Sequence, residues 1–318
     1  MLRGEGPARA SSLPLYSRFV SNSFSDVSRY VYGTTRLGDE SIPFSERLAI
    51  VREAVAAGLW IHTSHQYGDA LNVLKALFAE DPNKIPSTIF KLGYSSPEEV
   101  RGQINQQLEA VGTTSMTVGQ IFPSGQLAED LCTGGASIAG LEKLKEEGLV
   151  SRFEMEVWPW SSDIALRCIQ GGHADHLIEA YTFYLNPLQR FVSNDVWDLL
   201  LERNVSIVAM RTVAGGDVRH ALAKPDAPAY LRERAASIAP IFEASGIESW
   251  TEFAVRFAFS FDPVCATVGS TARSANLAEF LNATENPEPL DPEIIREILM
   301  LQRQWSTGHD ALAEPWSM

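Results

Sequence analysis

The residue types best suited to proton chemistry lie close together near residue 65 of the sequence. Two imidazoles and a phenol, His62, His65 and Tyr67, directly follow the apolar pair Trp60-Ile61. An imidazole changes its charge near neutral pH, and a phenol keeps its proton up to a pKa of about 10 unless a cation lies beside it. The cluster therefore predicts acid–base catalysis at the end of a strand. Ordinary solvent-facing loop residues are the alternative interpretation.

Lys91, in the next short apolar stretch, can supply that cation. A positive charge beside the Tyr67 phenol lowers its pKa toward the range in which it exchanges a proton with a substrate. Tyr67 and Lys91 are therefore candidates for one shared acid–base site. His62 and His65 also have the spacing His-x-x-His, but successive strand residues point to opposite faces and no convincing cysteine or carboxylate ligand joins them. We expect no metal site.

Short apolar segments recur along the chain, with helical periodicity between them. They are centred near residues 32, 61, 90, 119, 155, 179, 207 and 267, in most cases roughly thirty residues apart. This pattern predicts a single (β/α)8 TIM barrel, with an insertion after the seventh strand to fill the wider last interval. An open, doubly wound sheet is disfavoured because neither a G-x-G-x-x-G nor a P-loop pattern occurs.

A barrel of this kind places every loop that follows a strand on one rim. The side chains expected at that rim are His62, His65, Tyr67, Lys91, Trp158, Arg211 and Ser270. We expect the barrel to span residues 29–318, including a C-terminal tail, and residues 1–28 to form an N-terminal arm.

Composition narrows the class of partner. The net charge of −14 disfavours a nucleic acid or an anionic membrane as the main partner, and no apolar run is long enough for a membrane span. Three widely separated cysteines fit free thiols in a reducing compartment. We expect a soluble cytoplasmic protein, a monomer or small homo-oligomer, that acts on a small-molecule substrate.

Five segments, in the right order, resemble motifs of the aldo-keto reductase superfamily. His-Thr-Ser-His-Gln-Tyr-Gly at 62–68 resembles the family's D-T-A-x-x-Y-G, and Phe-Lys-Leu-Gly at 90–93 resembles its lysine strand. The other three segments are 139–148, 209–216 and 268–277. The resemblance covers residues 30 to 283. It implies a barrel that uses NADP(H) to oxidise or reduce a carbonyl or sugar-like alcohol, with Tyr67 delivering the proton and Lys91 beside it.

The resemblance also implies a site for the cofactor phosphates at the ends of the seventh and eighth strands. The residues that correspond to it are Arg211, Gly269, Ser270, Thr271, Arg273 and Asn276. Arginine suits phosphate oxygens, and a glycine lets a backbone approach a ligand closely. A solvated basic rim is the alternative.

Other positions depart from the family's pattern. Its catalytic aspartate corresponds to His62, and its catalytic histidine falls at Ile121 or Phe122, neither of which transfers a proton. With the aspartate gone, we expect Lys91 to lack a counter-charge and to deprotonate more readily. His62 is expected to replace the aspartate as a hydrogen-bond partner, and His65 could take over the missing histidine's role of orienting the substrate.

The sequence also departs from the family's pattern at the residues that bind the nicotinamide ring. The Ser-Asn pair that holds the carboxamide falls near Glu156-Val157, and the aromatic residue that stacks on the ring falls at Met210. Trp158 and Trp160 are candidates for lining a substrate pocket, or they are packing residues. Two further functions therefore stay open. One is a redox-neutral isomerase or lyase on a sugar-like substrate that uses Tyr67, His62 and His65, and the other is a non-catalytic sensor.

Overall fold

The computed structural model describes residues 24–214, 217–223 and 228–306. In this part of the chain, eight parallel strands form the barrel. They are β1 (Tyr30–Gly33), β2 (Trp60–Thr63), β3 (Thr88–Tyr94), β4 (Met116–Pro123), β5 (Val150–Glu156), β6 (Ile178–Asn186), β8 (Ser206–Met210) and β9 (Val264–Gly269). They coincide with the eight apolar segments of the sequence.

The sheet is closed. Its strand order is β5-β4-β3-β2-β1-β9-β8-β6, and a further pairing of β5 with β6 joins the two ends. A two-residue strand, β7 (Gln189–Arg190), pairs antiparallel with the end of β6 and lies outside the predicted pattern. The prediction of a (β/α)8 barrel is confirmed.

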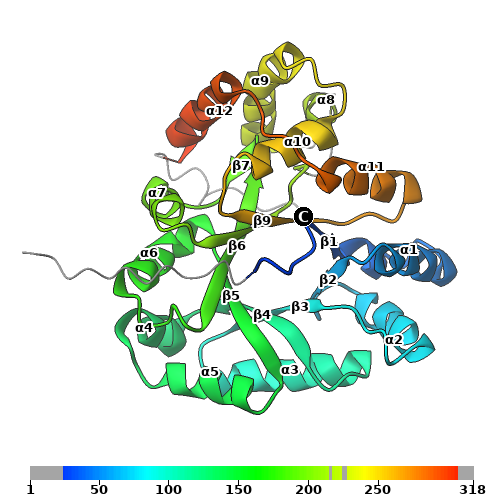
Figure 1. Cartoon of the computed structure of the whole chain (residues 1–318), viewed down its shortest axis with the longest axis vertical. Coiled ribbons are helices and arrows are strands. Elements are labelled where there is room, and N and C mark those ends of the chain that lie inside the picture. Colours follow the sequence, from blue (N-terminus) through cyan, green and yellow to red (C-terminus); the bar gives the residue numbers. More distant parts are fainter. Residues whose placement is uncertain (1–23, 215–216, 224–227, 307–318) are drawn as a thin grey trace, which may run out of the picture.

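Helices surround the strands on all sides (Figure 1). They are α1 (Phe44–Ala56), α2 (Ala70–Glu80), α3 (Pro97–Val111), α4 (Gly125–Thr133), α5 (Ser137–Glu146), α6 (Ser162–Gly171), α7 (Asn194–Glu202), α8 (Val218–Ala223), α9 (Ala229–Ala244), α10 (Trp250–Phe259), α11 (Ser274–Glu285) and α12 (Pro292–Trp305), with 3-10 turns η1 (Thr35–Gly38) and η2 (Pro159–Ser161). The predicted insertion after the seventh strand is present as α8 and α9. Among the described residues, no helix has the length and apolarity needed to cross a membrane.

Local signals set most helix starts. The Ser96 and Ser193 hydroxyls accept hydrogen bonds from the third residue of α3 and α7, as expected for N-caps. Ser45 would suit an N-cap by residue type, but α1 begins one residue earlier, at Phe44, and its N-cap is Pro43. Helix α4 was also unexpected from the sequence, since it is only nine residues long and shows little more than two turns of periodicity.

The two faces of each strand pack differently. Val31 and Val118 belong to an apolar cluster inside the barrel that includes no helix residue. Tyr32 and Ile121, at neighbouring or nearby positions, belong to the larger cluster that the strands share with the surrounding helices. Because side chains alternate with a period of two, an inward apolar residue fixes the direction of every second residue after it. This register decides which polar side chains enter the barrel.

Aromatic and basic side chains close the amino-terminal end of the barrel. Phe24, within the predicted N-terminal arm, is fully buried and packs with the interior cluster. The Arg152 guanidinium lies 5.1 Å from the ring centre of Phe24 and 5.5 Å from that of Trp60. It also pairs with Asp26 at 2.6 Å. Ligands therefore have to enter from the opposite end.

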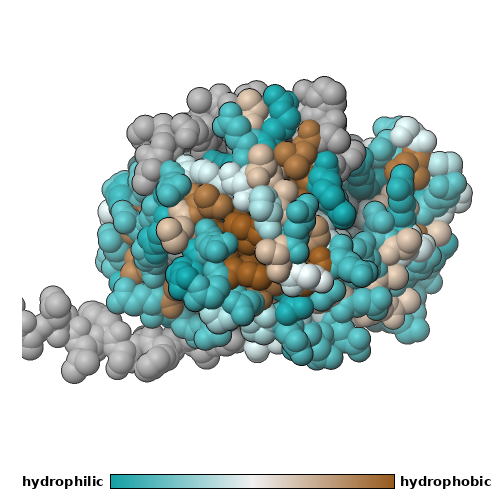
Figure 2. Space-filling view, turned by 90° about the horizontal axis from the view of Figure 1, so that it is seen from above, coloured by the Kyte–Doolittle hydropathy of each residue, from teal (hydrophilic) through white to brown (hydrophobic). Residues whose placement is uncertain are grey.

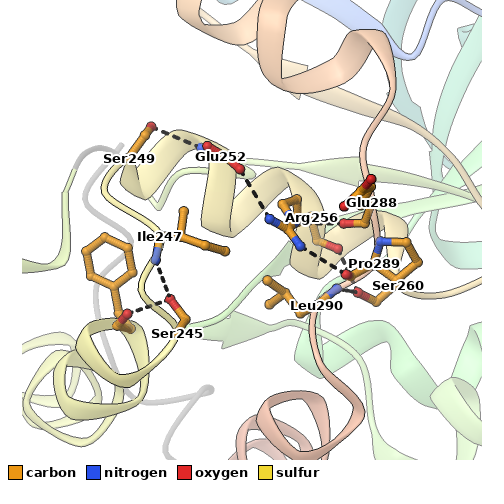
Figure 3. Close-up of polar contacts among 10 residues, drawn as sticks. Ser245, Ile247, Ser249, Glu252, Arg256, Ser260, Glu288, Pro289 and Leu290 are labelled. Carbon is orange, nitrogen blue, oxygen red and sulfur yellow. Dashed lines mark hydrogen bonds and ion pairs between the residues drawn. The ribbon is translucent and has the colours of Figure 1, made fainter.

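One arginine fixes the link between α11 and α12 to α10 (Figure 3). Arg256 donates to the carbonyl oxygens of Glu288 at 2.8 Å and Pro289 at 3.3 Å, and to the Glu252 carboxylate at 3.2 Å. In the same place, Leu290 N donates to the Ser260 hydroxyl at 2.9 Å. These bonds give the carbonyl oxygens of Glu288 and Pro289 a charged donor from α10.

The helices at the top of Figure 1, among them α9 and α12, form the face seen in Figure 2. Apolar residues gather in the middle of this face, with hydrophilic residues around them. Helix α12 has few fully buried apolar residues, Ile298 being one, while Ile295 and Leu299 are only partly covered.

Arg256→Ala should lower the free energy of unfolding by about 1–3 kcal/mol, because two backbone carbonyls lose their charged donor. Thermal and urea unfolding measure this change. Arg296→Ala is the matched control, since Arg296 is exposed and, within the described residues, forms an ion pair with Glu293 one turn away. An exposed pair of this kind contributes about 0–1 kcal/mol. Equal losses in the two variants would contradict the role given to Arg256.

Candidate active site

Four polar side chains point into the barrel near the carboxyl ends of adjoining strands. His62, Lys91 and Gln120 each lie two residues beyond an apolar residue of the interior cluster, so the same strand register turns them inward. Glu156 ends β5, the strand that pairs with β4. His62 is 3% exposed, Gln120 is 0% exposed and Glu156 is 5% exposed. Catalytic residues of barrel enzymes occupy this end of the strands.

These four side chains form one chain of contacts. Lys91 Nζ lies 2.7 Å from Glu156 Oε1. Gln120 Nε2 donates to Glu156 Oε2 at 2.9 Å, and Gln120 Oε1 lies 2.7 Å from His62 Nε2. Since the amide nitrogen of Gln120 faces Glu156, its oxygen accepts from His62, which fixes the proton of that imidazole on Nε2.

The expectation that Lys91 lacks a counter-charge is wrong. Burial by itself would lower the pKa of Lys91, but the adjacent Glu156 carboxylate, together with Tyr67 and Tyr184, outweighs that effect, and the pKa is raised. The ammonium is therefore held in its charged form. The anion comes from β5 instead of β2, where the family resemblance had placed an aspartate.

His62 does not take the place of that aspartate beside the lysine, because its Nε2 is bonded to Gln120. Burial, with the nearby Lys91 charge, lowers the pKa of His62 to about 4. The imidazole is consequently neutral at physiological pH and adds no second positive charge to the site.

Gln120 is the residue that the sequence interpretation missed. The family's catalytic histidine corresponds to Ile121 or Phe122 in the sequence. Ile121, however, is 1% exposed and packs in the outer cluster with the helices. Counting in steps of two from the inward Val118 identifies Gln120 from the sequence alone. Its neighbour across β3 is Lys91.

Tyr67 lies in the loop between β2 and α2, with its ring centre 6.4 Å from that of His62. Burial raises the pKa of the phenol, while the charge of Lys91 acts in the opposite direction. A hydrogen bond with Thr35 also lowers it. The structure thus brings Tyr67, Lys91 and His62 together, as expected from the sequence.

His65 is half-buried in the same loop. Its backbone N–H donates to Gln107 Oε1 at 2.9 Å, and burial lowers the pKa of its imidazole. Within the described part of the chain, its Nδ1 is buried without a hydrogen-bond partner. In the described part of the structure, no contact links the His65 ring to His62, Gln120, Glu156 or Lys91. A role of His65 in orienting a substrate therefore stays a prediction.

The segment after β9 combines bound and exposed groups. The Ser270 hydroxyl accepts from Arg36 N at 2.9 Å, and the Thr271 hydroxyl accepts from Arg273 N at 3.1 Å. The Arg273 and Asn276 side chains are exposed at the start of α11. That helix has no acidic residue in its first turn. The free N–H groups of a helix start attract anions.

Gly269 has a packing reason to be a glycine. A Cβ atom at this position would lie 2.7 Å from the Phe280 ring of α11. Close approach to a phosphate is therefore not needed to explain this residue. Nearby, Ser274 donates to the Glu53 carboxylate at 3.0 Å, so one acidic side chain also borders the segment.

Arg211 directly follows β8, and its guanidinium contacts an aromatic cluster. Its guanidinium lies 5.5 Å from the ring centre of Tyr184. Trp158 also packs on Tyr184 at 5.0 Å and stacks on Trp160 at 5.2 Å, with 10° between the two indole planes. Trp160 is 44% exposed. The two tryptophans thus lie at the carboxyl end of β5 beside β6, where a substrate pocket was expected.

Glu154, two residues before Glu156 on β5, is a buried carboxyl that the sequence did not single out. It is 0% exposed, and both of its oxygens lack hydrogen-bond partners in the described residues. Burial, followed by repulsion from Glu156, raises its pKa to about 8. Glu154 therefore holds a proton at neutral pH.

A closed barrel with acid–base side chains at the carboxyl ends of its strands defines the class of (β/α)8 enzymes. The family model for the aldo/keto reductase family matches residues 29–302. The chain belongs to the aldo/keto reductase family, as its motifs predicted. No curated protein matches its sequence.

Solved structures agree with this fold. The holo form of aldo-keto reductase AKR11C1 from Bacillus halodurans has a TM-score of 0.66 at 19% identity, covering 87% of this chain and 95% of that one. An aldo-keto reductase from Klebsiella pneumoniae in complex with NADPH has a TM-score of 0.65 at 16% identity, with coverage of 87% and 92%. A K. pneumoniae aldo/keto reductase in complex with NADP and acetate has a TM-score of 0.63 at 15% identity, with the same coverage.

Glu154→Gln should make the protein more stable than the wild type, and increasingly so as pH rises from about 5 to about 8. The folded state keeps this proton up to about pH 8, whereas an unperturbed glutamate loses it near 4.5. Unfolding in that window releases the proton, so the wild type loses stability as pH rises. The difference should reach a few kcal/mol, at about 1.4 kcal/mol per pKa unit.

Urea unfolding of both proteins at several pH values measures this difference. Glu243→Gln on the exposed surface of α9 is the control, because it removes the same charge without burial. A stability difference that is the same at pH 5 and pH 9 would show that Glu154 is ionised throughout.

Proposed function

We propose that this protein is an NADP(H)-dependent oxidoreductase that interconverts a carbonyl compound and an alcohol, including sugar-like alcohols. The observation that carries the proposal is the half-buried Tyr67 phenol, which lies within the field of a lysine ion-paired with Glu156. A phenol beside a fixed cation can give its proton to a carbonyl oxygen and remain stabilised as the phenolate.

The residues at the end of β9 fit the phosphate end of the cofactor. Arg273 and Asn276 are exposed at the first turn of α11, where N–H groups and an arginine favour a phosphate. Family membership and the two K. pneumoniae reductases described with NADPH and NADP support the same cofactor. When bound, it supplies the hydride for reduction.

The chain's own residues supply the proton. Burial keeps the Tyr67 proton in place at neutral pH, so the phenol is ready to act as an acid toward the substrate carbonyl. Lys91 stabilises the phenolate that remains, and Glu156 prevents Lys91 from losing its charge. Gln120 fixes the second oxygen of Glu156 and is itself held by the neutral His62. Each of these side chains therefore has one defined electrostatic role.

One observation favours a redox-neutral isomerase or lyase as the second candidate. Glu156 is bonded to Lys91 and Gln120, so it does not offer the amide and hydroxyl that the family resemblance predicts for the nicotinamide carboxamide. Tyr67, with the neutral His62 beside it, could then move protons on a sugar-like substrate without a hydride. Cofactor binding separates the two candidates.

Titration of the purified protein with NADPH, NADH and their oxidised forms is the first test. Tryptophan fluorescence is a suitable readout because Trp158 and Trp160 lie at the carboxyl end of the barrel. We expect saturable binding of NADPH in the micromolar range, weakened by Arg273→Ala through loss of a phosphate contact. Absence of binding at millimolar NADPH would exclude the oxidoreductase and leave the redox-neutral enzyme and the non-catalytic sensor.

Tyr67→Phe should reduce the rate of carbonyl reduction by about 10²-fold or more, because the proton donor is lost. NADPH-dependent turnover of an aldehyde panel, followed by absorbance of the reduced cofactor, measures this rate. NADPH affinity should stay within a few-fold of the wild type. Tyr230→Phe on α9 is the control for loss of a phenol hydroxyl away from the site. Unchanged turnover in Tyr67→Phe would remove Tyr67 from the mechanism.

A further inference from the structure

The two acid–base residues of the proposed mechanism come from separate segments, and their relative position needs a connection. Lys91 lies on β3, whereas Tyr67 lies in the loop after β2. A displacement of about 1 Å between reacting groups can reduce a rate by 10²-fold. Helix α3, which packs outside β3, supplies this connection.

Gln107 on α3 joins the two segments through one side-chain amide. It is 0% exposed. Its Oε1 accepts from His65 N at 2.9 Å, and its Nε2 donates to the Lys91 carbonyl oxygen at 2.9 Å. Both bonds go to backbone atoms, one in the loop that carries Tyr67 and one in the residue that carries the ammonium. The amide thereby spans the gap between them.

Other contacts hold the far side of the same loop. A Cβ atom on Gly38 would lie 2.0 Å from the Tyr67 carbonyl oxygen, so the backbone of η1 touches that of the loop directly. Arg47 donates to the Leu37 carbonyl oxygen at 2.7 Å and to Asp69 at 2.8 Å. The loop is thus fixed to η1 on one side, and Gln107 provides its link to β3 on the other.

We infer that Gln107 is a positioning residue, which sets the Tyr67 phenol relative to the Lys91 ammonium without touching the substrate. The inference rests on the proposed function of Tyr67 and Lys91. A glutamine suits the task because it offers one acceptor and one donor to the two backbone groups at once. A carboxylate at this position would place a negative oxygen against the Lys91 carbonyl oxygen, and a protonated carboxyl would again offer a donor.

Gln107→Met tests the inference with a side chain of similar size that forms neither hydrogen bond. Hydrogen exchange of the 62–70 segment gives a readout that does not depend on activity, because the His65 amide loses its acceptor. We expect faster exchange there, a kcat lowered by about 10-fold or more, and NADPH affinity within a few-fold of the wild type. Gln103→Met, at a buried glutamine one turn earlier on α3, is the matched control, since Gln103 is not a partner in either bond.

Gln107→Glu adds a test by pH. Its activity relative to the wild type should be lowest when the carboxyl is ionised and should recover at lower pH, as protonation restores the donor toward Lys91. A purely structural role would change thermal stability without this relative pH dependence. Unchanged exchange of the 62–70 segment in folded Gln107→Met would overturn the inference, as would a kcat equal to that of Gln103→Met.

The failure of the wider proposal would look different. If the wild type binds no NADPH and reduces no carbonyl, the proposed function fails, while the hydrogen-exchange comparison still decides whether Gln107 holds the loop. If the wild type is active and exchange alone changes in Gln107→Met, the amide holds the loop but does not position the phenol, and the inference is overturned.

Discussion

The ion pair between Lys91 and Glu156 is the interaction on which the rest of the site depends. Partial burial of the Lys91 ammonium lowers its pKa, and an anion beside it opposes that effect. Glu156 supplies that anion from β5, at 2.7 Å, and Gln120 then satisfies the carboxylate's second oxygen. The familiar arrangement of a cation beside a phenol is kept, although its counter-ion now comes from another strand.

Much of this architecture follows from the sequence. Eight apolar segments and the helical patterns between them predicted the barrel, and the motif around Tyr67 predicted which loop carries the phenol. Tyr67, Lys91 and His62 do meet at the carboxyl ends of the strands. Period-two alternation from Val118 also turns Gln120 inward. The family resemblance pointed instead to Ile121 or Phe122.

What the sequence could not provide is the contact between side chains of different strands. Glu156 follows Lys91 by 65 residues and lies two strands away in the sheet order, so the stagger of the strands decides that they meet. For the same reason, the sequence identifies Glu156 only as a position where the family's carboxamide-binding Ser-Asn pair is replaced. Gly269 illustrates the opposite error. It fits a phosphate-loop pattern in the sequence, but the close packing of Phe280 is enough to explain why this residue is a glycine.

The direct contact between Gly38 and the Tyr67 backbone has a consequence for comparing relatives of this protein. Any side chain at position 38 would force the loop away, since even a methyl group would overlap the Tyr67 carbonyl oxygen. A relative could therefore keep every acid–base side chain and still be inactive. Judging catalytic competence in this branch of the family requires examining the residue at position 38 together with the titratable residues.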